Sequence, residues 1–245
     1  MNSNEELDKI LSNVESWLTH QKELDVPIFI SDSDDTVYQA ELDTAVIDKR
    51  LNQIDENFVT AKSLTELDSI INNCMKCELG SKRKKFVFGV GNHFSEIVFV
   101  GEAPGRDEDE QGEPFVGRAG KLLNEMLKEI GLKREEVFIC NILKCRPPGN
   151  RDPLPNEVEK CEPYLLKQLS LLKPKIIVAL GRIAGNTLLK TSETLTNLRK
   201  EIYDYYGIPL VVTFHPAAIL RNPHWKTPTL DDLKKAKKYL EEVTN

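Results

Sequence analysis

From residue 86 onward, apolar runs of strand length alternate with longer segments of helical periodicity, and this alternation constrains the fold most. Strands that alternate with helices along a chain form a mainly parallel sheet with helices on both faces. We therefore expect an α/β protein, a three-layer α/β/α sandwich around a small parallel central sheet. The expected strands span 86–90, 96–101, 137–143, 175–180 and 209–214, and the expected helices span 119–130, 156–172, 182–190 and 229–243.

The N-terminal part of the chain is acidic and lacks this alternation. Residues 1–70 hold 16 acidic against 5 basic residues, whereas residues 71–245 hold 23 acidic against 28 basic. We expect an acidic extension over 1–67, helical or partly disordered. A folded domain then covers 68–245, and its mildly basic balance suits a polyanionic partner.

Within the extension, helical periodicity covers 5–19 and a segment around 41–54. Ser63 and Glu66 then form a capping-box pattern. The amphipathic helix that carries Trp17 can bind a protein partner or cap this chain itself, and the sequence leaves both open.

Apolar patterning argues against membrane insertion and secretion. No apolar run reaches about 18 residues, the least that a membrane-spanning helix needs. The first residues, MNSNEELDKI, lack a basic region followed by an apolar one, and they are too acidic for a transit peptide. We expect a cytoplasmic protein without membrane contact.

The segment 101–120, GEAPGRDEDEQGEPFVGRAG, directly follows an expected strand. In open α/β sheets, ligands bind outside the carboxyl ends of the strands. Pro104 and Gly105 fix a turn at this edge. A helix begins after Gly117, so its first backbone N–H groups can receive a phosphate or an oxyanion. An ordinary glycine-rich connection remains the alternative for this segment.

Five cysteines provide a second signal. Cys74 and Cys77 form a Cys-x-x-Cys pair, and Cys140, Cys145 and Cys161 follow. An odd number in a chain without a secretion signal argues against a disulfide framework. A pair joined by two distant cysteines supplies four thiolates, which suits tetrahedral zinc or a [4Fe-4S] cluster. Unrelated buried thiols are the third alternative, and spacing alone does not decide among them.

Polar side chains stand at three expected strand ends. Glu102, Asn141 and His215 would face the same edge of the sheet, with Phe115 on the connecting loop. An asparagine amide offers a donor and an acceptor to an imide edge, a phenyl ring stacks on a ring face, and a histidine can stabilise an oxyanion. Each residue alone has an ordinary structural explanation, but the set suits a planar heterocycle.

The motifs GEAPG, PFVGRAG, NILKCRPPGNR and FHPAAILRNP, with four of the cysteines, resemble the family 4, iron-sulfur uracil-DNA glycosylases. The resemblance covers about residues 68–243. It implies a DNA repair enzyme that flips uracil out of DNA and hydrolyses the N-glycosidic bond, which releases uracil and leaves an abasic site. It also implies a [4Fe-4S] cluster on Cys74, Cys77, Cys145 and Cys161, with Cys140 as a spare.

The resemblance assigns roles by position. Phe115 is expected to stack on the flipped uracil, Asn141 to pair with its Watson–Crick edge, and His215 to lie against O2. Glu102 is expected to shape the pocket or polarise the reacting centre. The expected substrate-binding residues are Gly101, Ala103, Gly105, Phe115, Asn141 and His215, and the expected catalytic residues are Glu102, Asn141 and His215.

The water-activating residue stays open. Related glycosylases of other families carry Asp or Asn where this chain has Ala103. Glu102 or Asn141 would orient the water, or a nearly formed cation would capture it late.

Basic and aliphatic residues near these motifs are candidates for DNA contact, with a solvated surface or simple packing as the alternative. The run 82–85, KRKK, is a weaker candidate of the same kind. We expect Arg118, Lys121, Lys144 and Arg146 to contact phosphates, Leu220 or Ile219 to act as a minor-groove wedge, and Arg221 to contact the backbone.

The rival class is a non-catalytic, metal-stapled nucleic-acid-binding module in a replication or repair complex. The intact set of Glu102, Phe115, Asn141 and His215 favours the enzyme. We expect a monomer that acts on uracil-containing DNA in a prokaryotic cytoplasm, associated with the nucleoid.

Overall fold

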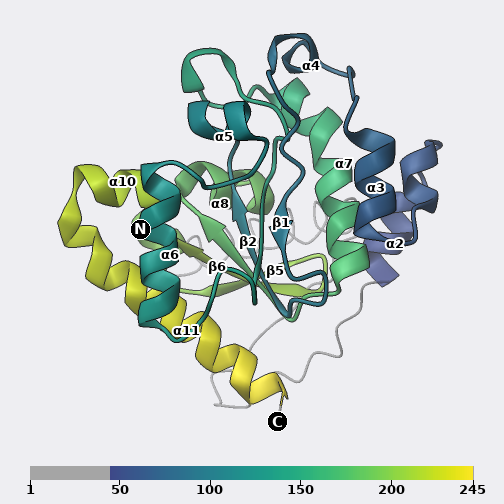
Figure 1. The fold of residues 1–245 in the computed structure, drawn as a ribbon. Helices are drawn as coiled ribbons and strands as arrows, with labels where there is room; N and C mark the ends of the chain where they lie inside the picture. The colour runs from purple at the N-terminus through teal and green to yellow at the C-terminus, as the bar shows by residue number, and fades with distance from the viewer. Residues whose placement is uncertain (1–44, 245) are drawn as a thin grey trace, which may run out of the picture. The chain divides into compact units, whose positions relative to one another are not determined.

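A six-stranded sheet organises the computed structural model, which describes residues 45–244, and its strand order is β1-β3-β2-β4-β6-β5 (Figure 1). The four central strands pair in parallel, whereas both edge strands are antiparallel to their neighbours. The expected parallel central sheet is therefore confirmed, and each edge adds one antiparallel strand. The strands are β1 (Val90–Gly91), β2 (Ile97–Gly101), β3 (Phe138–Asn141), β4 (Ile176–Leu180), β5 (Ile202–Tyr205) and β6 (Ile208–Thr213).

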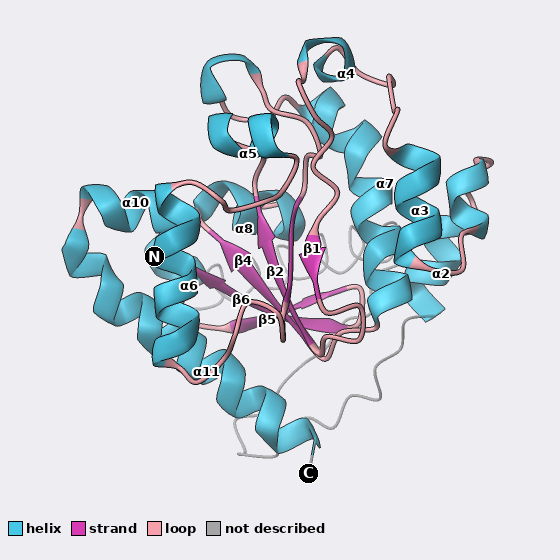
Figure 2. Ribbon diagram, in the orientation of Figure 1, coloured by secondary structure: helices cyan, strands magenta, loops and turns pink. Residues whose placement is uncertain are grey.

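Helices cover both faces of this sheet, as the α/β/α expectation requires (Figure 2). Successive side chains of a strand point to opposite faces, so Val98 and Val100 join one core while Ile97 and Phe99 join the other. The first core includes side chains of α2 (Ala45–Leu51), α3 (Leu64–Ile71), α7 (Pro155–Leu172) and α8 (Arg182–Leu189). The second includes side chains of α6 (Arg118–Glu129), α10 (Pro216–Arg221) and α11 (Lys226–Thr244).

Short elements account for most differences from the expected pattern. The strand expected over 86–90 is reduced to the two residues of β1. A tight turn with positive φ at Tyr206 and Gly207 joins β5 to β6, and the helical periodicity used for prediction does not detect such a hairpin. The remaining elements are α4 (Leu79–Lys82), α5 (Arg106–Gln111), α9 (Leu195–Leu198), η1 (Asn57–Thr60), η2 (Pro148–Asn150) and η3 (Pro223–Trp225).

Part of the expected extension belongs to the folded core. Ile47, Leu51, Phe58 and Leu67 are buried in the same core as α7. The boundary expected at residue 67 therefore lies inside a packed layer, because these apolar side chains complete one face of the sheet. The helix expected over 5–19 lies outside the described residues.

The capping box of α3 is confirmed in its main bond. Ser63 Oγ accepts a hydrogen bond from the Glu66 N–H over 3.1 Å, so this helix begins where the sequence indicates. Between residues 45 and 244, no helix combines the length and the apolar character that a membrane span requires.

Candidate active site

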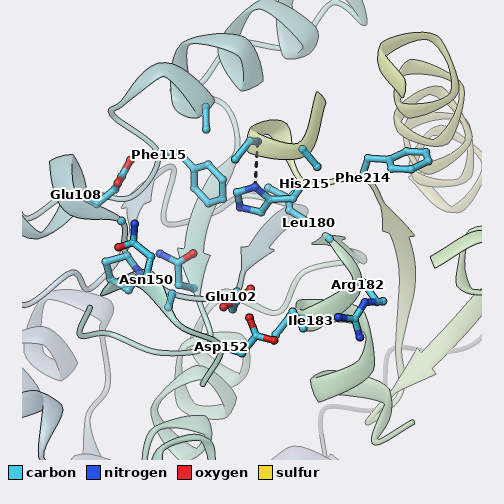
Figure 3. Close-up of a pocket in the computed structure, with 18 of the residues that line it drawn as sticks. Glu102, Glu108, Phe115, Asn150, Asp152, Leu180, Arg182, Ile183, Phe214 and His215 are labelled. Atoms are coloured by element: carbon cyan, nitrogen blue, oxygen red, sulfur yellow. Dashed lines mark hydrogen bonds between the residues drawn. The ribbon is translucent and has the colours of Figure 1, made fainter. Parts of the chain in front are cut away.

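A cavity of about 540 Å³ opens at the carboxyl ends of the parallel strands (Figure 3). This is the edge where open α/β sheets bind their ligands. The lining residues that the sequence singled out are Glu102, Ala103, Pro104, Gly105, Phe115, Asn141, His215 and Arg221. The sites expected at three separate strand ends thus meet in one cavity.

Asn141 forms the floor of this cavity at the end of β3. It pairs in register with Gly101 on β2, and its side chain is buried. Its Oδ1 atom has no hydrogen-bond partner among the described residues. A buried amide oxygen without a partner costs about 1–3 kcal/mol, so such an atom is a site prepared for a ligand donor.

Gly101 makes room for this amide. A Cβ atom at Gly101 would lie 2.3 Å from Asn141 Oδ1 and 2.7 Å from the Phe115 ring. The absent side chain therefore lets the amide and the aromatic ring converge on one point.

Phe115 is held beside the cavity in a strained backbone conformation, with φ of 53°. Arg134 fixes the loop by donating to the carbonyl oxygens of Pro114 over 2.6 Å and of Phe115 over 3.3 Å. Gly120 lets the first turn of α6 approach, because a Cβ atom there would collide with the Phe115 carbonyl. The ring is thus placed by its surroundings before any ligand arrives.

His215 lies beside Phe115 in the cavity wall, with ring centroids 5.5 Å apart and planes inclined by 34° (Figure 3). Its Nδ1 accepts a hydrogen bond from the Ala217 N–H over 3.1 Å. Burial lowers the pKa of His215 to about 4, and the nearby charge of Arg221 acts in the same direction. A neutral ring whose Nδ1 accepts carries its proton on Nε2, so His215 can donate from that atom.

Glu102 lines the cavity directly after β2. Burial, with a smaller contribution from the charge of Asp152, raises the pKa of Glu102 to about 7 against the opposing charge of Arg182. Figure 3 shows the Glu102 and Asp152 carboxylates on the same side of the cavity. A carboxyl group with a pKa near 7 can exchange a proton at neutral pH, which suits acid–base work.

Glu108 Oε1 accepts hydrogen bonds from the backbone N–H groups of Val116 and Gly117 over 3.0 and 3.1 Å. These two residues precede α6, which begins at Arg118, so the phosphate or oxyanion site expected at the first N–H groups of this helix stays a prediction. The acidic segment after Gly105 folds back and braces the Phe115 loop from the other side.

Sequence reasoning missed part of the cavity wall. Gly181, Arg182, Asp152 and Trp225 line it as well. Gly181 packs against His215, because a Cβ atom there would lie 2.9 Å from the His215 Cβ. Gly181 and Arg182 directly follow β4, so the same rule of strand ends would have found them.

Four of the residues expected at DNA lie together on the surface. Arg118 and Lys121 are exposed on α6, Leu220 and Arg221 are exposed on α10, and the two helices contact each other. Arg146 lies on another loop, where its Nε donates to Asn150 Oδ1 over 2.7 Å.

Lys144 does not belong to that surface. Its side chain is fully buried, and its ammonium donates to the Asn141 carbonyl over 2.7 Å and to Gln168 Oε1 over 2.5 Å. Burial also lowers its pKa. The expected phosphate contact is therefore wrong. The Lys144 ammonium group lies inside the fold, behind the strand that carries Asn141, and cannot reach a phosphate.

The run 82–85 is also engaged internally. Arg83 donates to the carbonyl oxygens of Asn72 and Cys74 and to Cys145 Sγ. Lys82 and Lys84 pair with nearby glutamates. Its arginine thus supports the cysteine region instead of a DNA backbone.

All five cysteines are free thiols: Cys140, Cys145 and Cys161 are buried in the core to which α7 contributes, and Cys74 and Cys77 pack against it. Hydrogen bonds reach three of these sulfurs: Tyr164 Oη donates to Cys74, Arg83 to Cys145, and the Lys144 N–H to Cys161, over 3.2, 3.4 and 3.3 Å. Burial raises the pKa of Cys145 to about 11 and of Cys161 to about 12. Donors aimed at buried sulfurs fit thiolates that bind iron or zinc.

Within residues 45–244, no three side chains of Cys, His, Asp or Glu are grouped as a metal ion requires. A single zinc ion would draw its four sulfurs to about 2.3 Å from its centre. A cluster of several irons carries its thiolates at the corners of a larger unit. Both zinc and iron–sulfur clusters accept thiolate ligands, so the donor chemistry of Cys74, Cys77, Cys145 and Cys161 fits either group.

The cavity at the carboxyl edge of the parallel sheet is lined by an aromatic ring, a histidine and an amide whose oxygen has no partner within residues 45–244, a set that suits a planar heterocycle. The sequence pattern of the uracil DNA glycosylase superfamily matches residues 88–241, and the chain belongs to this superfamily.

The chain is also similar to several proteins named type-4 uracil-DNA glycosylase. It is 48% identical to that of Archaeoglobus fulgidus over 182 residues, which cover 71% of this chain and 92% of the relative. It is 45% identical to that of Saccharolobus solfataricus over 179 residues, 69% of this chain and 83% of the relative. It is 43% identical to that of Thermotoga maritima over 188 residues, 75% of this chain and 98% of the relative.

Proposed function

We propose that this protein is a DNA repair glycosylase that flips uracil out of DNA and hydrolyses its N-glycosidic bond. The products are free uracil and an abasic site. One observation carries the proposal above the others. Asn141 holds a buried amide oxygen without a partner beside the Phe115 ring.

Asn141 would read the edge of the base. The N3–H of uracil can donate to Oδ1, and the Asn141 amide nitrogen can donate to the uracil O4. Cytosine lacks the N3 proton and carries an amino group, so it would face donor to donor and acceptor to acceptor. Because Asn141 is buried and packed on Gly101, a reversal of its amide group to suit cytosine would cost free energy.

Phe115 and His215 would hold the ring and take up the charge that forms. Stacking on Phe115 recovers part of the energy that base flipping consumes. Cleavage moves the bonding electron pair to N1 and makes a uracil anion whose charge extends to O2. The Nε2–H of neutral His215 can donate to that oxygen, which stabilises the leaving group.

Glu102 is our candidate for orienting the attacking water. In its ionised form it can accept a proton from the water as the oxygen bonds to C1′, and the uracil anion takes up a proton on release. Its pKa of about 7 keeps much of it ionised at neutral pH. Ala103, also in the wall, offers no such group.

Cys74, Cys77, Cys145 and Cys161 would hold a [4Fe-4S] cluster with a structural role. When bound, the cluster supplies a cross-link between distant parts of the chain. These parts are the segment before the sheet, the loop after β3, and α7. The loop that follows Cys145 contributes Pro147, Asn150 and Asp152 to the cavity wall, so the cross-link would stabilise the site.

Arg118, Lys121, Arg146 and Arg221 would contact the DNA backbone, and Leu220 would fill the gap left by the flipped base. We further propose that the protein works as a monomer on the nucleoid of a prokaryotic cytoplasm. The acidic N-terminal extension would bind a protein partner.

A direct assay tests the proposed function. The protein is incubated with a uracil-containing oligonucleotide, and alkali then breaks the strand at abasic sites. We expect a break at the uracil, and none with a thymine oligonucleotide of the same sequence. Asn141→Ala should abolish the break while the far-UV spectrum is retained. An intact strand with the wild-type protein would favour the rival class, a binding module without catalysis.

A further inference from the structure

We propose that Trp225 forms a second base-binding subsite, which stacks on the nucleobase next to uracil in the same DNA strand. This inference rests on the proposed function. It adds a contact for a nucleotide that does not react.

The indole of Trp225 is one layer of an ordered stack. It lies 4.8 Å from the Phe214 ring, centroid to centroid, with an angle of 15° between the planes. The Arg199 guanidinium lies 4.4 Å from the centroid of the same Phe214 ring. Phe214 thus contacts both an aromatic ring and a cation, and both contacts favour a fixed ring orientation.

The stack is anchored in the core. Arg199 donates to both carboxylate oxygens of Asp232, over 2.6 and 3.1 Å, and Asp232 is buried. Thr213, at the end of β6, donates to the same carboxylate over 2.5 Å. A bidentate pair with a third donor holds Arg199 firmly, and Arg199 in turn supports Phe214. The position of Trp225 is therefore set by the sheet.

Trp225 also reaches the reaction cavity. It lines the cavity together with His215 and Arg221, yet 37% of its surface is exposed. Because one face of the indole contacts Phe214, its exposed part belongs to the other face and the edge. An indole placed only for packing would be covered more fully, since this ring is large and apolar.

Leu220 indicates which ligand meets this face. It lies on α10, five residues before Trp225, and its side chain is 44% exposed. When uracil leaves the stack, the adjacent base loses a stacking partner. An aromatic face beside the cavity mouth can replace that partner, and single-strand binding proteins use aromatic side chains in this way.

Binding to a single-stranded oligonucleotide with a non-cleavable 2′-fluoro-deoxyuridine tests the proposal. Trp225→Leu keeps an apolar contact with Phe214 but removes the aromatic face. We expect it to raise the Kd at least about fivefold, the low end of the effect of one base–aromatic stack. Trp225→Phe should restore most of the affinity, and thermal melting of both variants checks the fold.

Abasic spacers locate the contact. The spacer is placed on one side of the uracil and then on the other. On the side whose base stacks on Trp225, the spacer should weaken wild-type binding, and the Kd values of wild type and Trp225→Leu should become equal. The chain has two tryptophans, so Trp17→Phe leaves Trp225 as the single fluorophore. Its emission should be quenched by the intact oligonucleotide and not by the oligonucleotide with that spacer.

Three results would overturn the proposal. They are equal affinity of wild type and Trp225→Leu, a difference that persists with spacers on both sides, and a difference confined to duplex DNA. The last result would assign the indole to the opposite strand. Release of uracil by the wild-type protein is measured in parallel, so failure of this subsite is distinguished from failure of the proposed function.

Discussion

The backbone N–H of Ala217 donates to Nδ1 of His215, and this one bond determines which ring nitrogen can donate into the cavity. Because the ring is buried, it stays neutral down to a pH of about 4. The fold therefore presents a hydrogen-bond donor without a positive charge, which suits an oxygen that becomes anionic only during the reaction.

The stability of the protein should depend on His215 between pH 6.5 and 4. The ordinary pKa of 6.5 applies in the unfolded chain, and the folded pKa is about 4, so the unfolded state binds more protons in this window. His215 therefore favours unfolding as the pH falls, by up to about 3 kcal/mol. Denaturant unfolding at pH 7 and pH 5 should show a smaller loss for His215→Asn than for wild type. Equal losses would contradict the assigned pKa.

Glu102 should make the reaction rate rise with pH, and its carboxylate should lower the stability of the protein above pH 7. Its pKa of about 7 predicts that the single-turnover rate rises as the pH passes 7, because only the carboxylate accepts a proton from water. Glu102→Gln should lower the rate by roughly 10²–10⁴-fold and flatten this rise. Above pH 7 the same variant should be more stable than wild type, since it lacks the buried carboxylate that is charged in the wild-type protein.

Asp152 provides the matched control for Glu102. Its charge raises the Glu102 pKa, so Asp152→Asn should move the midpoint of the rate profile to lower pH without flattening it. A midpoint that stays in place would show that another group titrates in the wild-type profile.

The strand ends of this site could be predicted from sequence, whereas the supports behind them could not. Apolar runs locate β2, β3 and β6, and the residues after a parallel strand must meet at one edge, so Glu102, Asn141 and His215 followed. No sequence signal indicates that the Lys144 side chain points into the core, because lysine is almost never fully buried and its partner Gln168 is distant in the chain. Glu108 likewise has no sequence signal for its role, although it braces the Phe115 loop.

Gly101 should be intolerant of even one methyl group. In Gly101→Ala, the new Cβ would meet Asn141 Oδ1 and the Phe115 ring, and both must shift. We expect uracil release to fall at least about 100-fold, the scale of a misplaced contact, while the sheet still forms. Single-turnover assays and thermal melting separate a lost site from a lost fold.

Surface cations and the buried Lys144 should respond differently to salt. Arg118→Gln and Lys121→Gln should each reduce the slope of log Kd against log salt concentration by about one, as loss of a phosphate contact does. Lys144→Met should leave that slope unchanged and lower the melting temperature, because the Asn141 carbonyl and Gln168 lose their donor. A changed slope for Lys144→Met would contradict its burial.

The cysteines allow the sharpest test of the cluster, because Cys140 is an internal control. It is fully buried on β3 but stands apart from the expected ligand set, so Cys140→Ala should keep the brown colour and the absorbance at about 400 nm of an anaerobic preparation. Cys145→Ser should lose both, together with iron content and melting temperature. The Arg83 guanidinium then meets a serine hydroxyl in place of the Cys145 sulfur, and the Lys144 N–H meets a Cys161 sulfur that no cluster keeps ionised, which adds to the loss of the cross-link. A colourless wild-type protein that contains zinc would refute the cluster, and equal effects of the two variants would refute the assignment of its ligands.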